Sequence, residues 1–220
     1  MQLRCIAVDF DHTLARLDDP GYRELFAIFT ARGVPLEIVE LSYQAVKASN
    51  GFSLPNLLGE VSDRGFVLDE PAIRMAFDGY LGAKLHPYSD TLTAVQSWRD
   101  RHIPVVIVTA GADSYQREKV VAVKIPCDLV LVVSRVNQKT ELIQALLEQY
   151  GSPLIFVDDK GSELDALRDA HLKEDAVATV RILRPDSPYY NQVPRYHHME
   201  VTTLTDVALV DTLGATVAGG

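Results

Sequence analysis

Two aspartates, Asp9 and Asp11, follow directly on a short apolar run at residues 5–8 (CIAV). A short apolar run of this kind is typical of a buried strand. Side chains two residues apart on a strand point to the same face, so we expect the two carboxylates side by side at the strand's end. Two like charges in one place are costly unless a cation or a reaction requires them. The pair therefore predicts metal-dependent or acid–base chemistry.

Polar residues follow three further apolar runs in the same way. The runs are 105–108, 129–133 and 154–157. The polar residues are Thr109, which is followed by Ala110, after the first run, Lys139 soon after the second, and Asp158 and Asp159 directly after the third. Ligands of an open parallel sheet collect at the carboxyl ends of its strands. A hydroxyl and an ammonium group beside carboxylates favour a phosphoryl group, oriented by Thr109 and Lys139. Asp159 is then expected to anchor a divalent metal, with Asp158 close by.

This set of residues indicates a route for cleaving a phosphate monoester. Mg²⁺ placed between substrate and protein offsets the repulsion between a phosphate and an attacking carboxylate. Asp9 can then attack phosphorus and form an aspartyl-phosphate. Asp11 is placed to protonate the leaving oxygen and later to take a proton from the water that cleaves the intermediate.

The order of these motifs resembles the haloacid dehalogenase superfamily of phosphohydrolases. The motifs are DFDHT at 9–13, VIVTAG at 106–111, a lysine that opens a helix at 139, and IFVDD at 155–159. The resemblance implies a Rossmann-like core with the first strand central, a nucleophile at Asp9 and an acid/base at Asp11. The implied Mg²⁺ ligands are the Asp9 carboxylate, the Asp11 backbone carbonyl and the Asp159 carboxylate, with Asp158 beside them. The implied phosphate contacts are Thr109, Ala110 and Lys139.

Three residues refine what the resemblance implies. Family members that cleave carbon–halogen bonds, and the ion-pumping ATPases, lack a carboxylate at the place of Asp11, so its presence favours phosphatase or phosphomutase chemistry. His12 stands where glycine is common, which predicts a wider turn or an imidazole that contacts substrate. Glu163 stands where Asp or Asn is usual, and its longer side chain is expected to reach the metal through water.

Apolar periodicity and cap signals predict alternating strands and helices. Strands are expected over 3–8, 105–108, 129–133, 154–157 and 178–183. Helices are expected over 22–32, after Pro35, and over 69–81, 90–101, 114–121, 140–150, 163–170 and 205–213, with a loop at 50–65. The predicted fold class is α/β, a Rossmann-like doubly wound parallel sheet with an inserted α-helical cap subdomain. The predicted core comprises residues 1–17 and 83–220, and the predicted cap residues 18–82.

Composition excludes several classes of partner. The chain has 220 residues, 47% of them hydrophobic, and a formal net charge of −9. With no basic stripe, a nucleic-acid partner is not expected. No run approaches the roughly 20 apolar residues of a membrane span, and Asp9 interrupts the first apolar stretch too early for a signal peptide. The two cysteines are expected to be buried thiols. A cytoplasmic protein is predicted, and nothing indicates its oligomeric state.

The predicted function is a Mg²⁺-dependent phosphatase acting on a small phosphorylated metabolite. A phosphomutase or phosphotransferase would use the same residues, and a catalytically silent relative that binds phosphate or a partner also stays open. A receiver-type signalling module is disfavoured, because here acid pairs flank the lysine in chain order. Joint metal ligation by His197 and His198 is disfavoured too, because adjacent strand residues point to opposite faces.

Overall fold

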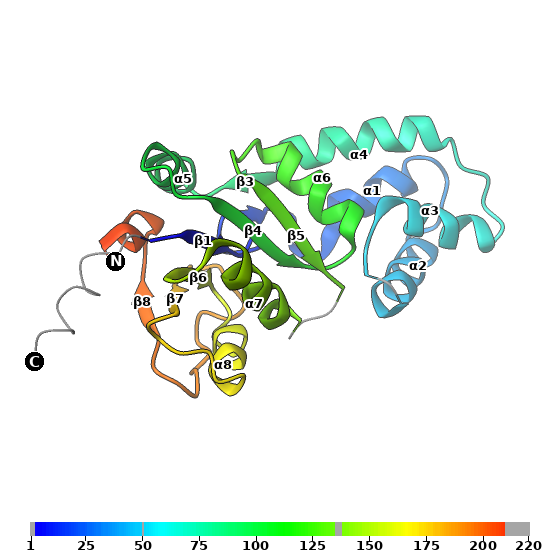
Figure 1. Ribbon diagram of the computed structural model, residues 1–220. Coiled ribbons are helices and arrows are strands. Elements are labelled where there is room, and N and C mark those ends of the chain that lie inside the picture. Colours follow the sequence, from blue (N-terminus) through cyan, green and yellow to red (C-terminus); the bar gives the residue numbers. More distant parts are fainter. Residues whose placement is uncertain (1–2, 50, 135–137, 210–220) are drawn as a thin grey trace, which may run out of the picture. The chain divides into compact units, whose positions relative to one another are not determined.

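The computed structural model describes residues 3–49, 51–134 and 138–209. Its main sheet has six strands in the order β5-β4-β1-β6-β7-β8. They are β1 (Cys5–Val8), β4 (Val105–Ala110), β5 (Leu129–Val133), β6 (Leu154–Asp158), β7 (Val177–Ile182) and β8 (Met199–Val201). β1 pairs in parallel with both β4 and β6, and β7 pairs in parallel with both β6 and β8. The predicted α/β sheet with an internal first strand is confirmed (Figure 1).

Helices cover both faces of this sheet because its strands are apolar on both sides. α7 (Lys139–Tyr150) and α8 (Gly161–Asp169) lie on one face. There, Ile143 of α7 and Leu164 of α8 share a buried cluster with Cys5 and Ala7, alternate residues of β1. α5 (Thr91–Asp100) and the 3₁₀ helix η2 (Leu204–Leu209) lie together on the opposite face. Trp98 of α5 is completely buried.

A second compact unit comprises residues 17–86 and 110–124. It contains η1 (Pro20–Tyr22), α1 (Arg23–Thr30), α2 (Leu36–Ser49), α3 (Leu54–Asp63), α4 (Glu70–Lys84) and α6 (Asp113–Val123). Its core is rich in aromatic rings, with Phe52 at 4.7 Å from Tyr115 and 5.5 Å from Tyr43 between ring centroids. α6 belongs to this unit because Tyr115 packs into that cluster, whereas the sequence placed the helix in the core. A role of this unit as a cap stays a prediction. Two short strands, β2 (Ala15–Leu17) and β3 (Leu85–Pro87), pair with each other.

Several local predictions were wrong. The loop expected at 50–65 contains α3, whose N-terminus is capped by the Ser53 hydroxyl accepting the Asn56 N–H at 3.3 Å. Ser and Pro at this place are start signals of a helix rather than of a loop. Two leucines on helices, Leu41 and Leu92, are exposed. The helix expected over 205–213 is the 3₁₀ helix η2 as far as Leu209, and the remaining residues lie outside the described ones.

The two cysteines differ in burial: Cys5 is buried and Cys127 is half-buried. Among the described residues, no helix combines the length and the apolar character that crossing a membrane requires.

Candidate active site

The register of two central strands brings the first two acids together. Val8 of β1 pairs with Val157 of β6, so the residues that follow, Asp9 and Asp158, are neighbours across the strands. The Asp9 N–H extends this ladder by donating to the Val157 carbonyl at 2.9 Å. Both side chains alternate onto the face that α7 and α8 cover. Asp9 is 5% exposed and Asp158 1% exposed, so their carboxylates are nearly removed from water.

Lys139 lies between these two carboxylates. It is the first residue of α7, and its Nζ donates to Asp9 Oδ1 at 2.6 Å and to Asp158 Oδ2 at 2.8 Å. The ammonium group is itself buried. Burial opposes the charged form, but the nearby charges of Asp158 and Asp9 raise the pKa of Lys139 above its usual value. Lys139 is therefore a permanent cation at neutral pH.

Asp159 completes a group of three buried acids. Each of Asp9, Asp158 and Asp159 offers a carboxylate oxygen, and these oxygens lie within 4.8 Å of one another, a spacing that can hold a metal ion. The Asp159 backbone N–H donates to Thr13 Oγ1 at 3.1 Å. The Ser187 hydroxyl donates a short hydrogen bond to Asp159 Oδ2. Hard oxygen donors of this kind suit Mg²⁺.

Burial makes this acid group electrostatically unfavourable without a cation. Burial raises the pKa of Asp9 to about 7, an effect that Lys139 reduces and that Asp158 and Asp11 increase. Burial likewise raises the pKa of Asp159 to about 8, with further contributions from the charges of Asp9 and Asp158. The acids thus hold protons at a pH where an exposed carboxyl has lost its own. A divalent cation would relieve this repulsion.

A second ion pair adjoins the group. Glu163, in the first turn of α8, is almost fully buried, and its Oε1 lies 3.4 Å from Lys160 Nζ. When all are ionised, the four carboxylates and two ammonium groups leave two net negative charges. The participants are Asp9, Asp158, Asp159, Glu163, Lys139 and Lys160. A divalent cation would neutralise this excess, so the residues present fit such an ion.

Thr109 is buried, and its hydroxyl makes no hydrogen bond to the described residues. It lies near the end of β4. A buried polar atom without a partner usually signals a missing ligand or a functional role. The following residue, Ala110, has its carbonyl oxygen held by Gln116 Nε2 at 2.8 Å. That side chain packs against Gly111, whose φ of +147° and lack of Cβ allow the close approach.

Backbone hydrogen bonds close the turn after β1. The Phe10 carbonyl accepts the Leu14 N–H at 2.9 Å, and the His12 N–H donates to the Ala15 carbonyl at 2.8 Å. His12 itself adopts a left-handed φ of 56°, a conformation that favours glycine. Asp11, one residue earlier, is half-buried. Its charge contributes to the raised pKa of Asp9.

The structure thus brings together Asp9, Lys139, Asp158 and Asp159 by direct contact or common spacing. The backbone-carbonyl role of Asp11 and the phosphate contacts of Thr109, Ala110 and Lys139 stay predictions. Sequence reasoning missed Thr13 and Ser187, which hold Asp159. Thr13 was visible within the first motif, whereas no local signal marks Ser187.

The two adjacent histidines serve separate roles. The His198 ring is buried, with Nδ1 at 2.8 Å from Thr179 Oγ1 and Nε2 at 3.0 Å from Asp165 Oδ1. His197 is exposed. The two rings therefore do not converge on one metal. This agrees with the sequence analysis, which disfavoured joint ligation by the pair.

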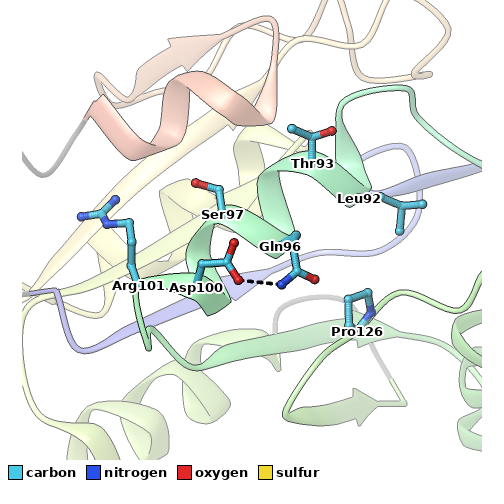
Figure 2. A pocket seen from close by; sticks show the side chains of 7 residues that line it. All are labelled: Leu92, Thr93, Gln96, Ser97, Asp100, Arg101 and Pro126. Carbon is cyan, nitrogen blue, oxygen red and sulfur yellow. Dashed lines mark hydrogen bonds between the residues drawn. The ribbon is translucent and has the colours of Figure 1, made fainter.

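A surface hollow of about 800 Å³ lies beside α5 (Figure 2). Its lining residues are Leu92, Thr93, Gln96, Ser97, Asp100, Arg101 and Pro126. None of them belongs to the acid group, and the Asp100 carboxylate is already engaged by Gln96 Nε2 at 2.7 Å. The hollow therefore adds nothing to the candidate site.

No model of a protein family matches the sequence, and no curated protein matches it either. Solved structures do match. A haloacid dehalogenase-like hydrolase from Burkholderia xenovorans LB400 is 18% identical with a TM-score of 0.70, over 96% of this chain and 97% of that one. A predicted phosphoglycolate phosphatase from Haemophilus somnus 129PT is 14% identical with a TM-score of 0.55, over 96% and 99%. An L-2-haloacid dehalogenase is 18% identical with a TM-score of 0.57, over 95% and 99%. The chain has the fold of the haloacid dehalogenase-like hydrolases.

Proposed function

We propose that the protein is a divalent-cation-dependent phosphatase of the haloacid dehalogenase superfamily, acting on a small phosphorylated metabolite. The observation that carries this proposal is the set of three buried acids around Lys139, together with the Thr109 hydroxyl, which has no hydrogen-bond partner in the described part of the chain. The acids suit a hard cation, and the hydroxyl and ammonium groups suit phosphoryl oxygens. Solved structures with this fold are described both as phosphatases and as dehalogenases, so the reaction type rests on the site residues.

The proposed roles combine the contacts of Lys139 with the place of Asp11 two residues after Asp9. Lys139 holds Asp9 Oδ1, which leaves Oδ2 as the nucleophile for phosphorus. As the new O–P bond forms, the bond from phosphorus to the leaving oxygen breaks, and Asp11 gives that oxygen a proton. Water then attacks the aspartyl-phosphate, Asp11 takes a proton from it, and inorganic phosphate leaves with Asp9 restored.

The cation and the phosphate each have candidate partners in the chain. Asp9 and Asp159 would hold Mg²⁺ through their carboxylates, with Asp158 beside them. When bound, the cation supplies positive charge that stabilises the ionised acids and draws the negative phosphate towards them. Thr109 Oγ1 and Lys139 Nζ would donate hydrogen bonds to phosphoryl oxygens.

Asp11 favours phosphatase over dehalogenase chemistry. Cleaving a carbon–halogen bond releases a halide, which needs no proton, whereas an alkoxide leaving group does. A carboxyl group two residues after the nucleophile supplies that proton. By resemblance, dehalogenases of this superfamily lack a carboxylate at this place.

The test compares turnover of a generic aryl phosphate with halide release from an L-2-haloacid, both in Mg²⁺. We expect phosphate release from the wild type, and a loss on the order of 10³-fold or more in Asp9→Asn, because the nucleophile is removed. Asp100→Asn, the same change at an exposed helix position, should retain wild-type turnover. Halide release without phosphatase activity, or full turnover in Asp9→Asn, would overturn the proposal.

A further inference from the structure

Ser187 makes a contact that the sequence motifs do not contain. Its hydroxyl donates to Asp159 Oδ2 and at the same time accepts the Tyr189 N–H at 2.9 Å. Because the backbone N–H occupies a lone pair of the hydroxyl oxygen, the hydroxyl proton is directed at the carboxylate. Ser187 and Asp159 are both buried, at 7% and 3% exposure, so water does not compete strongly for this bond.

The backbone around Ser187 is anchored to the turn after β1. The Ser187 N–H donates to the Arg184 carbonyl at 2.9 Å. The Arg184 guanidinium is buried and donates to the Thr13 carbonyl at 3.1 Å and to Asp90 Oδ1 at 2.8 Å. Thr13 in turn accepts the Asp159 N–H. The serine is therefore tied to the same turn that holds the backbone of Asp159.

The rest of the segment 184–198 is fixed on the N-terminal half of α8. Gln192 Oε1 accepts the Ser162 N–H at 3.4 Å, and Pro194 packs so closely on Gly161 that an added Cβ would lie 3.0 Å from its ring. Further along, the Asp165 carboxylate accepts the N–H groups of Arg195 and Tyr196. α8 begins two residues after Asp159, so the segment that carries Ser187 is anchored to the helix that directly follows the acid group.

We propose that Ser187 is a positioning residue for Asp159. Its hydroxyl occupies Oδ2, which fixes the carboxylate and leaves Oδ1 as the oxygen for the cation. Partners of this kind, behind the ligands themselves, commonly tune metal affinity. The inference rests on the proposed function, because it presumes a cation at the acid group.

The test is isothermal titration of Mg²⁺ into metal-free protein, which needs no turnover. We expect Ser187→Ala to bind about 10- to 100-fold more weakly than the wild type, because Asp159 loses its fixed orientation. Ser187→Thr retains the hydroxyl and should stay within a few-fold of the wild type. The matched control is Ser97→Ala, the same change at an exposed position of α5, which should leave the affinity unchanged.

The outcomes separate the two proposals. A wild type that binds no Mg²⁺ refutes the cation site and hence the proposed function. A wild type that binds, with Ser187→Ala binding equally well, refutes the positioning role alone. Lower stability of metal-free Ser187→Ala with unchanged affinity also refutes it, since that pattern is purely structural. If circular dichroism shows that Ser187→Ala is unfolded, Ser187→Cys replaces it, because a thiol is a much weaker hydrogen-bond donor than a hydroxyl. A Mg²⁺ affinity equal to that of the wild type in Ser187→Cys again overturns the inference.

Discussion

At the scale of single residues, the turn after β1 gives His12 an unusual backbone. Its φ of 56° lies in the left-handed region, and its Nδ1 is buried with no hydrogen-bond partner among the described residues. Residues with a Cβ pay a steric cost there that glycine avoids. The turn itself is needed, because it delivers Thr13 to the backbone of Asp159. The left-handed φ of His12 is therefore retained because this turn places Thr13 beside the backbone of Asp159.

This backbone predicts an order of stabilities at position 12. Removing the Cβ in His12→Gly should leave the free energy of unfolding within about 1 kcal/mol of the wild type, because steric relief offsets the added chain entropy. His12→Val should be less stable than His12→Gly by about 1–2 kcal/mol, since a β-branched side chain fits a left-handed φ poorly. Urea unfolding in EDTA measures both, with His197→Val as an exposed control. Equal stability of the Gly and Val variants would contradict the strain.

At the scale of elements, the Asp165 side chain on α8 holds the C-terminal end of the segment 184–198 by hydrogen bonds. This buried carboxylate accepts the Arg195 N–H at 2.9 Å, the Tyr196 N–H at 3.1 Å and a hydrogen bond from His198 Nε2 at 3.0 Å. The His198 ring links the Asp165 carboxylate to Thr179 Oγ1, which lies 2.8 Å from Nδ1. A side chain on one helix thus fixes the far end of the segment that carries Ser187.

Removing this carboxylate should loosen the segment. Asp165→Ala leaves buried donors unpaired, and we expect a loss of about 2–4 kcal/mol in the free energy of unfolding. Amide hydrogen exchange should accelerate most at Arg195 and Tyr196, whose N–H groups lose their acceptor. Asp169→Ala, which removes an exposed partner of Arg195, should cost at most about 1 kcal/mol. Unchanged exchange at 195 and 196 in Asp165→Ala would show that other contacts hold the segment.

The sequence predicted those elements whose signal is local. Continuous apolar runs marked β1, β4, β5 and β6, and the polar residues that follow β1, β5 and β6 include Asp9, Lys139 and Asp158, which contact one another in the structure. α3 was missed because Ser53 and Pro55 were interpreted as turn residues, although both are also signals of a helix start. Ser187 could not be predicted, because it lies 28 residues from Asp159 and its type is common in loops. Contacts between distant loops depend on the folded path of the chain, which no local pattern contains.

At the scale of the whole molecule, buried acids oppose folding when the cation is absent. The chain already carries a net charge of −9, and the acid group adds repulsion where water cannot screen it. Lys139 offsets part of this repulsion through two buried ion pairs. Burial, together with the repulsion that remains, raises the pKa values of Asp9, Asp158 and Asp159. The stability of the metal-free protein should therefore depend on pH through these acids.

The sign of that dependence follows from proton binding. The pKa values are raised to about 7 for Asp9 and about 8 for Asp159, whereas both fall to about 3.8 in the unfolded chain. Between these limits the folded state binds more protons, so the free energy of unfolding falls as pH rises. We expect the loss from pH 5 to pH 9 to be on the order of a few kcal/mol in EDTA, measured by urea unfolding. Saturating Mg²⁺ should flatten the profile, because it stabilises the ionised acids only in the folded state. Asp159→Asn removes one of these titrations and should show a shallower fall, so an identical slope in that variant would assign the pH dependence to other groups.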